Sequence, residues 1–138
     1  MILDKPAMIK DLLEKSKNIA VVGMSPNPER DSNKVGKYLI DKGYNVIPVN
    51  PSVSEIYGKK AYPSILDIPR DIKIDIVDIF RNPEASKEVV LQAPSLNPRA
   101  VWLQLGAENP DVIKTALSKN LDIVYGICIM VTHQKMSN

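Results

Sequence analysis

The stretch Asn18-Ile-Ala-Val-Val-Gly-Met-Ser25 decides the fold that we expect for this protein. Its apolar residues, 19–22, follow one another without polar interruption, which is typical of a strand buried on both faces. Gly23 ends this run, and a polar loop with two prolines leads to a helical pattern that begins near Asp31. A buried strand followed by a glycine turn and a helix is the opening unit of a βαβ fold.

Strands and helices continue to alternate on both sides of this stretch. The predicted helices run over 4–17, opened by Asp4, from Asp31 or Ser32 to Gly43, from Asn82-Pro83 to about 93, and from Asn109-Pro110 to about 117. The predicted strands are 18–23, 44–49, 74–80, 100–103 and 122–125, with one helical turn at 64–66 and a tail after 125. This alternation predicts a single domain, 1–138, with a three-layer Rossmann-like α/β fold: a mainly parallel sheet of about five strands with helices on both faces.

The composition excludes several classes of protein. A net charge of +2, spread evenly along the chain, argues against a nucleic-acid partner. No apolar stretch approaches the ~20 residues of a membrane span, and the first residues lack the pattern of a signal peptide. The single cysteine, Cys128, fits a reducing compartment. We therefore expect a cytoplasmic protein that binds neither nucleic acid nor membrane.

The fold predicts where a ligand binds. In open parallel sheets, ligands lie beyond the carboxyl ends of the strands, near the point where the strand order reverses. This rule selects the segments 23–34, 49–54, 79–83 and 104–109.

The segment after the first strand suits phosphate. Gly23 lets the backbone turn without a Cβ, and the following helix presents unpaired N–H groups and a positive dipole end. The polar side chains available there are Ser25, Arg30, Ser32, Asn33 and Lys34. A phosphorylated ligand is therefore expected.

The fingerprints of the commonest phosphorylated ligands are missing. A dinucleotide site needs three glycines, whereas here Gly23 stands alone in the loop and Gly36 lies inside the helix. Asn50-Pro51 replaces the acidic residue expected after the second strand, and there is no GxxxxGK[ST] loop. The sequence thus disfavours NAD and nucleoside triphosphates.

Catalytic and metal-binding residues are not predicted. Cys128 lies in an apolar run and is expected to be a buried, inert thiol, and His133 falls in the polar tail. One cysteine and one histidine are too few for a usual metal site. Asp75 and Asp78 are three apart in a predicted strand, so they point to opposite faces.

Five stretches, taken together, resemble the family of small bacterial and archaeal CoA-binding proteins, which is related to the CoA-binding domain of the succinyl-CoA synthetase α subunit. They are Val22-Gly-Met-Ser-Pro-Asn-Pro-Glu-Arg-Asp-Ser32, Gly43-Tyr-Asn-Val-Ile-Pro-Val-Asn-Pro51, Gly58-Lys-Lys-Ala-Tyr-Pro63, Val77-Asp-Ile-Phe-Arg81 and Val101-Trp-Leu-Gln-Leu-Gly106. They stand in the family's order and cover nearly the whole chain.

The resemblance implies that coenzyme A is the cofactor, bound as CoA or acyl-CoA, with a possible protein partner in acyl-CoA metabolism. It implies a phosphate site at Gly23, Met24, Ser25, Arg30 and Ser32, a cleft lined by Asn50, Pro51 and Ser52, an adenine near Phe80 and Arg81, and an opposite wall of Leu103, Gln104 and Gly106.

The chain departs from the family's pattern near its C-terminal end. Gly126-Ile127 stands where the family usually has a polar pair before the last cysteine, and Thr132 stands where it has an acidic residue before the histidine. No role is therefore carried over to this tail. Ligase activity is not carried over either, because the synthetase holds its phosphorylated histidine in a separate domain.

Two alternatives to a CoA-binding module remain open at this point. One is an NAD(P)-binding oxidoreductase or redox-sensing domain, which the fold suits and the missing fingerprint disfavours. The other is a protein-interaction domain that has lost its nucleotide.

Overall fold

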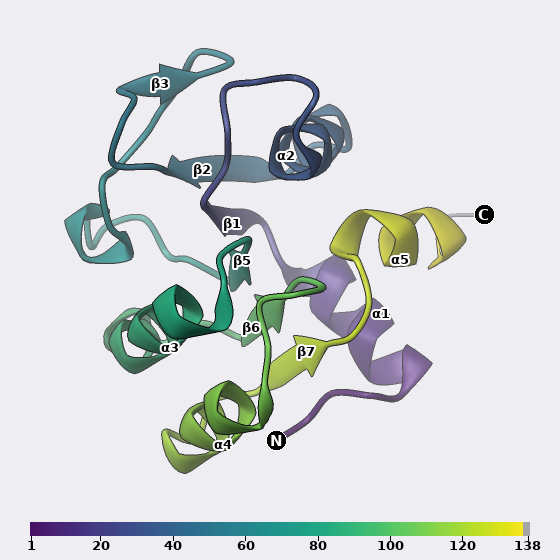
Figure 1. Ribbon diagram of the computed structural model, residues 1–138. Helices are drawn as coiled ribbons and strands as arrows, with labels where there is room; N and C mark the ends of the chain where they lie inside the picture. The colour runs from purple at the N-terminus through teal and green to yellow at the C-terminus, as the bar shows by residue number, and fades with distance from the viewer. Residues whose placement is uncertain (137–138) are drawn as a thin grey trace.

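A five-stranded parallel sheet forms the centre of the computed structural model, which describes residues 1–136 (Figure 1). Its strand order is β2-β1-β5-β6-β7, and every neighbouring pair is parallel. The strands are β1 (Asn18–Val22), β2 (Asn45–Val49), β5 (Ile76–Ile79), β6 (Ala100–Leu103) and β7 (Ile123–Tyr125). The predicted Rossmann-like α/β fold is confirmed.

Helices cover both faces of this sheet (Figure 1). One face carries α1 (Pro6–Lys15), α2 (Asp31–Asp41) and α5 (Ile129–Met136). The other face carries α3 (Pro83–Gln92) and α4 (Pro110–Ser118), with the short 3₁₀ helices η1 (Ile65–Asp67) and η2 (Ala93–Leu96). Each layer of helices encloses its own apolar core.

The two cores explain why the strands are apolar without alternation. In β1, Ile19 and Val21 belong to the core beneath α1, α2 and α5, whereas Ala20 and Val22 belong to the core beneath α3 and η1. Successive side chains of a strand point to opposite faces, so a sheet covered on both faces favours apolar residues at successive positions.

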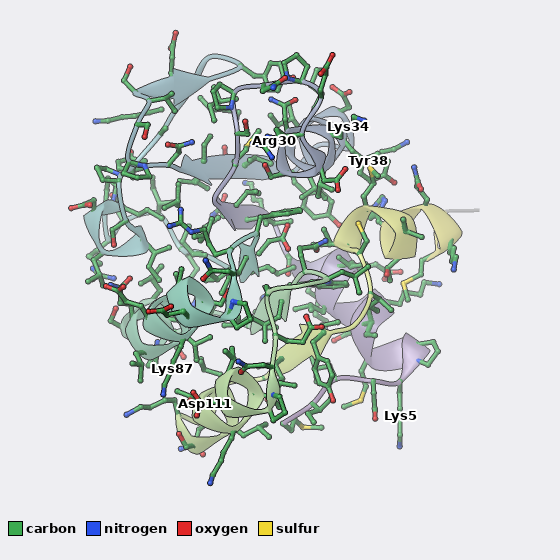
Figure 2. The ribbon with its side chains drawn as sticks, viewed as in Figure 1. Lys5, Arg30, Lys34, Tyr38, Lys87 and Asp111 are labelled. Atoms are coloured by element: carbon green, nitrogen blue, oxygen red, sulfur yellow. The ribbon has the colours of Figure 1, made fainter. Side chains whose placement is uncertain are left out.

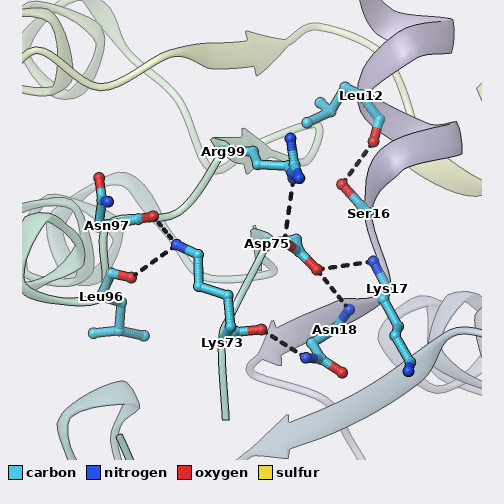
Figure 3. Close-up of polar contacts among 9 residues, drawn as sticks. All are labelled: Leu12, Ser16, Lys17, Asn18, Lys73, Asp75, Leu96, Asn97 and Arg99. Carbon is cyan, nitrogen blue, oxygen red and sulfur yellow. Dashed lines mark hydrogen bonds and ion pairs between the residues drawn. The ribbon is translucent and has the colours of Figure 1, made fainter. Parts of the chain in front are cut away.

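Asp75 joins three strands at the amino edge of the sheet (Figure 3). Its Oδ2 accepts hydrogen bonds from the backbone N–H groups of Lys17 and Asn18, at 2.8 and 3.0 Å, where β1 begins. Its Oδ1 lies 3.3 Å from Nε of Arg99, just before β6. This buried carboxylate is therefore structural and lies far from the carboxyl edge where a ligand is expected.

The helix starts were predicted with mixed success. Asn82 caps the backbone N–H of Ala85, and Asn109 caps that of Val112, as expected. The caps expected for the first two helices are wrong, because α1 begins after Lys5 and α2 after Arg30, without a side-chain cap.

Two structured segments were missed. The tail expected after residue 125 contains α5, and residues 52–63, for which no helix or strand is predicted, contain a small antiparallel hairpin of β3 (Glu55–Ile56) and β4 (Lys59–Lys60). Both depend on contacts with distant residues. Within residues 1–136, no helix is long and apolar enough to span a membrane.

Candidate functional site

The strand order reverses between β1 and β5. From β1 the chain passes to β2 on one side, and it later returns to place β5 on the other side. The loops that leave the carboxyl ends of β1 and β5 therefore diverge, which opens a crevice between them.

A cavity of about 670 Å³ lies at this point. It is lined by the loop after β1, the N-terminus of α2 and the loops after β5 and β6. The lining residues are Gly23, Ser25, Glu29, Arg30, Asp31, Ser32, Phe80, Arg81, Asn82, Leu105 and Gly106. Seven of the site residues predicted from the sequence line this cavity: Gly23, Ser25, Arg30, Ser32, Phe80, Arg81 and Gly106.

Gly23 allows the backbone at the end of β1 to lie close to the backbone at the end of β5. Its φ is +84°, and a Cβ built on it would lie 2.4 Å from the backbone oxygen of Phe80. Any other residue would carry both the strain of the left-handed region and a clash with backbone.

Polar side chains behind the cavity fix the shape of the loop after β1. The backbone N–H of Ser25 donates to Oγ of Ser32 at 3.0 Å, and Nδ2 of Asn33 donates to the backbone oxygen of Ser25 at 2.8 Å. On the other side, Nδ2 of Asn50 donates to the backbone oxygen of Met24 at 2.9 Å. These hydrogen bonds fix the position of the loop relative to α2 and to the end of β2.

Both signs of charge line the cavity. Arg30, just before α2, and Arg81, after β5, line the cavity; Lys34, one turn further along α2 (Figure 2), does not. The carboxylates of Glu29 and Asp31 also line it. The helix dipole and two guanidinium groups favour an anion, and the two carboxylates limit how much negative charge the cavity accepts.

A smaller cavity of about 160 Å³ adjoins the first one at Arg81, which lines both. Its walls come from the end of β2, η1 and α3, and include Pro51, Ile65, Ala85 and Val89. The two cavities both lie at the carboxyl ends of the strands, and we refer to them together as the cleft.

The remaining predicted site residues do not line the larger cavity. Met24, Leu103 and Gln104 are buried, and the Met24 side chain packs against Gly36 in the core. Asn33 is buried too and accepts a hydrogen bond from Tyr57. Among the others, Pro51 lines the smaller cavity, Asn50 is half-buried, and Lys34 and Ser52 are exposed.

Four lining residues of the larger cavity were missed: Glu29, Asp31, Asn82 and Leu105. All four lie inside the segments selected from the sequence, so segment position was the available signal. The expectation of a phosphate ligand pointed to basic and small polar residues, and it gave no reason to select acidic or apolar ones.

A further hollow of about 540 Å³ lies at the opposite, amino edge of the sheet, between α1, α5 and the start of β2. Tyr44 and His133 line it, with Lys10, Lys17 and Lys42 around them. Within residues 1–136, no three His, Cys, Asp or Glu side chains are grouped so that they could hold a metal ion.

Comparison with known proteins identifies relatives along nearly the whole chain. Residues 17–134 match a family described as a CoA binding domain. The uncharacterized Bacillus subtilis protein YneT is 39% identical over 127 residues, which are 92% of this chain and 93% of YneT. The structure of a hypothetical protein from Pyrococcus horikoshii superposes with a TM-score of 0.93 at 42% identity, covering 98% of this chain and 94% of the other.

A larger enzyme shares part of the sequence. The ADP-forming acetate–CoA ligase of Methanocaldococcus jannaschii is 33% identical over 61 residues. These residues are 44% of this chain but 9% of the ligase. The similarity therefore concerns one segment of a much longer protein.

Proposed function

Since this chain belongs to the CoA binding domain family, we propose that it binds coenzyme A in the cleft at the carboxyl ends of its strands. The observation that carries the proposal is the larger cavity at the reversal point of the strand order. The N-terminus of α2 and two arginines line this cavity together with Gly23, where a Cβ would lie 2.4 Å from the backbone oxygen of Phe80.

The phosphates of CoA occupy the larger cavity in this proposal. The N-terminus of α2 offers N–H groups and a positive dipole end, and Ser25 and Ser32 add hydroxyl groups. Arg30 is the candidate partner of the 3′-phosphate, because its exposed side chain reaches the cavity from the first residue before α2.

The adenine lies toward Phe80 and Arg81. Arg81 lines both cavities, and in this proposal its guanidinium stacks on the adenine ring, which continues toward Pro51. The pantetheine arm then leaves the phosphates in the other direction, past Gly106 at the end of β6.

The protein acts as a binding module, without catalysis of its own, in this proposal. The lining of the larger cavity contains no cysteine, histidine or lysine, and this proposal assigns its serines and carboxylates to ligand binding. Carrying, sensing or presenting CoA to an enzyme of acyl-CoA metabolism is the role that such a module fits.

Thermal unfolding with a panel of ligands tests the proposal. CoA at about 100 times its dissociation constant stabilises the fold by about 2.7 kcal/mol, which raises Tm by on the order of 5 to 10 °C. NAD, NADP and ATP are the comparison ligands. A larger shift with NAD or NADP would replace this proposal by a dinucleotide site, and no shift with any ligand would favour a protein-interaction domain.

Arg30→Ala tests the placement of the 3′-phosphate. Loss of a charge-assisted hydrogen bond should weaken CoA about tenfold and dephospho-CoA much less. Arg70→Ala is the matched control, because Arg70 is also exposed and lies outside both cavities. Equal weakening of CoA and dephospho-CoA by Arg30→Ala would move Arg30 away from the 3′-phosphate.

A further inference from the structure

Exposed apolar side chains occur at the ends of β6 and β7, and one of them lines the larger cavity. Leu105 is 68% exposed and lines the cavity itself. Tyr125, the last residue of the neighbouring strand β7, is 37% exposed, and Ile127 after it and Val131 in the first turn of α5 are 38% and 41% exposed. We call these four residues the apolar rim.

Two hydrogen bonds hold the parts of the apolar rim together. Nε1 of Trp102 donates to the backbone oxygen of Ile127 at 2.9 Å, and the backbone N–H of Ile129 donates to Oε1 of Gln104 at 3.2 Å. The segment from Ile127 to the start of α5 therefore lies beside the end of β6, next to Leu105. Figure 1 shows the loop after β6 reaching the start of α5.

The two apolar side chains nearest the strand ends stand at matching positions along β6 and β7. Leu103 and Tyr125 are register partners, and Leu105 and Ile127 each follow two residues later. Both loops turn at a glycine with a positive φ, of 90° at Gly106 and 81° at Gly126, although Gly106 follows Leu105 and Gly126 precedes Ile127.

We infer that the apolar rim binds the acyl chain of an acyl-CoA, so that apolar thioesters are preferred over free CoA. This inference rests on the proposed function. With the phosphates against Arg30 and the arm leaving past Gly106, the thiol end of the ligand emerges over Leu105. A short acyl chain carried there covers apolar surface that is otherwise left in water.

The inference predicts that affinity rises with chain length. Complete burial of a methylene is worth about fourfold in affinity, and a chain lying on an open rim gains about half of that free energy, roughly twofold per methylene. Isothermal titration calorimetry of the full chain with CoA, acetyl-CoA, butyryl-CoA and hexanoyl-CoA measures this. Hexanoyl-CoA should bind on the order of tenfold more tightly than acetyl-CoA.

In the double variant Ile127→Ser with Val131→Ser, the affinity should rise less with acyl chain length, because apolar surface of the rim is removed outside the cavity lining. Leu117→Ser is the matched control. Leu117 is 37% exposed near the C-terminal end of α4, at the amino edge of the sheet, and this variant should keep the wild-type dependence. Ile127→Val keeps the surface apolar, so it should keep most of the dependence of affinity on acyl chain length. Thermal unfolding of each variant verifies that it is folded.

Each remaining outcome decides against the inference. Tight CoA binding with no gain from longer chains would overturn it and leave the proposed function standing. Failure of every ligand to bind, CoA included, would overturn the proposed function and this inference with it. A dimer that the double variant dissociates, without dependence on chain length, would assign the apolar rim to a second copy of the chain instead.

Discussion

The hydroxyl oxygen of Tyr38 lies 2.6 Å from Nδ1 of His133, so α2 is hydrogen-bonded to α5 across 95 residues of sequence. The rings of Tyr38 and Tyr44 both meet the imidazole edge-on, at centroid distances of 5.5 and 5.7 Å. This aromatic contact helps to fasten the C-terminal helix to the domain.

The histidine contact makes the stability of the fold depend on pH. Burial lowers the pKa of His133, and the positive charge of Lys42 lowers that pKa further. The unfolded chain, with a pKa of about 6.5, therefore takes up the proton more readily than the folded chain. Stability should be fully present above pH ~6.5 and should fall as the pH is lowered from there toward the folded-state pKa.

Urea unfolding of the wild type and of His133→Gln between pH 7.5 and 5 measures this dependence. The difference in unfolding free energy between the two proteins should shrink as the pH falls, because glutamine does not titrate. A constant difference over this range would show that His133 has the same pKa in both states.

Asp78 should make an opposite contribution. It lies in the middle of β5 between Val21 and Trp102, it is fully buried, and neither carboxyl oxygen has a hydrogen-bond partner among residues 1–136. Burial raises the pKa of Asp78 well above its ordinary value. The contribution of Asp78 to the free energy of unfolding is therefore fully present below pH ~4, and it is lost as the pH rises toward the folded-state pKa.

Asp78→Asn keeps the shape of the side chain and removes the titration. The stability of the variant relative to the wild type should increase between pH 4 and pH 7.5, as measured by urea unfolding at both pH values. Parallel curves for the two proteins would mean that the carboxyl group titrates normally. Comparison within one pH removes the contribution of His133, which both proteins share.

Gly23→Ala should damage both the fold and the cleft. The new Cβ meets the backbone oxygen of Phe80 at 2.4 Å and also imposes the left-handed strain, which alone costs about 1–2 kcal/mol. Gly43→Ala is the control, because Gly43 has a similar φ of +93° and open space around it. Chemical denaturation should show that Gly23→Ala lowers the free energy of unfolding more than Gly43→Ala does. Only Gly23→Ala should lose CoA binding. Equal losses would show that the loops after β1 and β5 separate easily.

Gln104→Met should destabilise α5, although Gln104 itself lies outside this helix. The variant removes the buried acceptor of the Ile129 N–H, and an unsatisfied buried donor costs about 1–3 kcal/mol. Hydrogen exchange should accelerate at the first turn of α5 and remain unchanged in α3, on the other face of the sheet. Uniform acceleration in both helices would instead indicate global destabilisation.

Sequence by itself determined the central sheet and the region of the site. Unbroken apolar runs such as 19–22 identify strands buried on both faces, and the Asn-Pro pairs at 82–83 and 109–110 identify helix starts. These signals are local, because periodicity and capping act within one turn or one strand. The carboxyl-edge rule then selected the segments that line the larger cavity.

Only the tertiary structure decided which side chains face the cleft and where the chain's last helix forms. Met24 and Ser25 are neighbours in one loop, yet Met24 fills the core against Gly36 and Ser25 lines the cavity. The first N–H of α5 is held by Gln104, and its histidine by Tyr38, so its sequence alone reads as a tail. Contacts between residues far apart in the chain leave no local periodicity, and the packing of the two faces of the sheet is what brings them together.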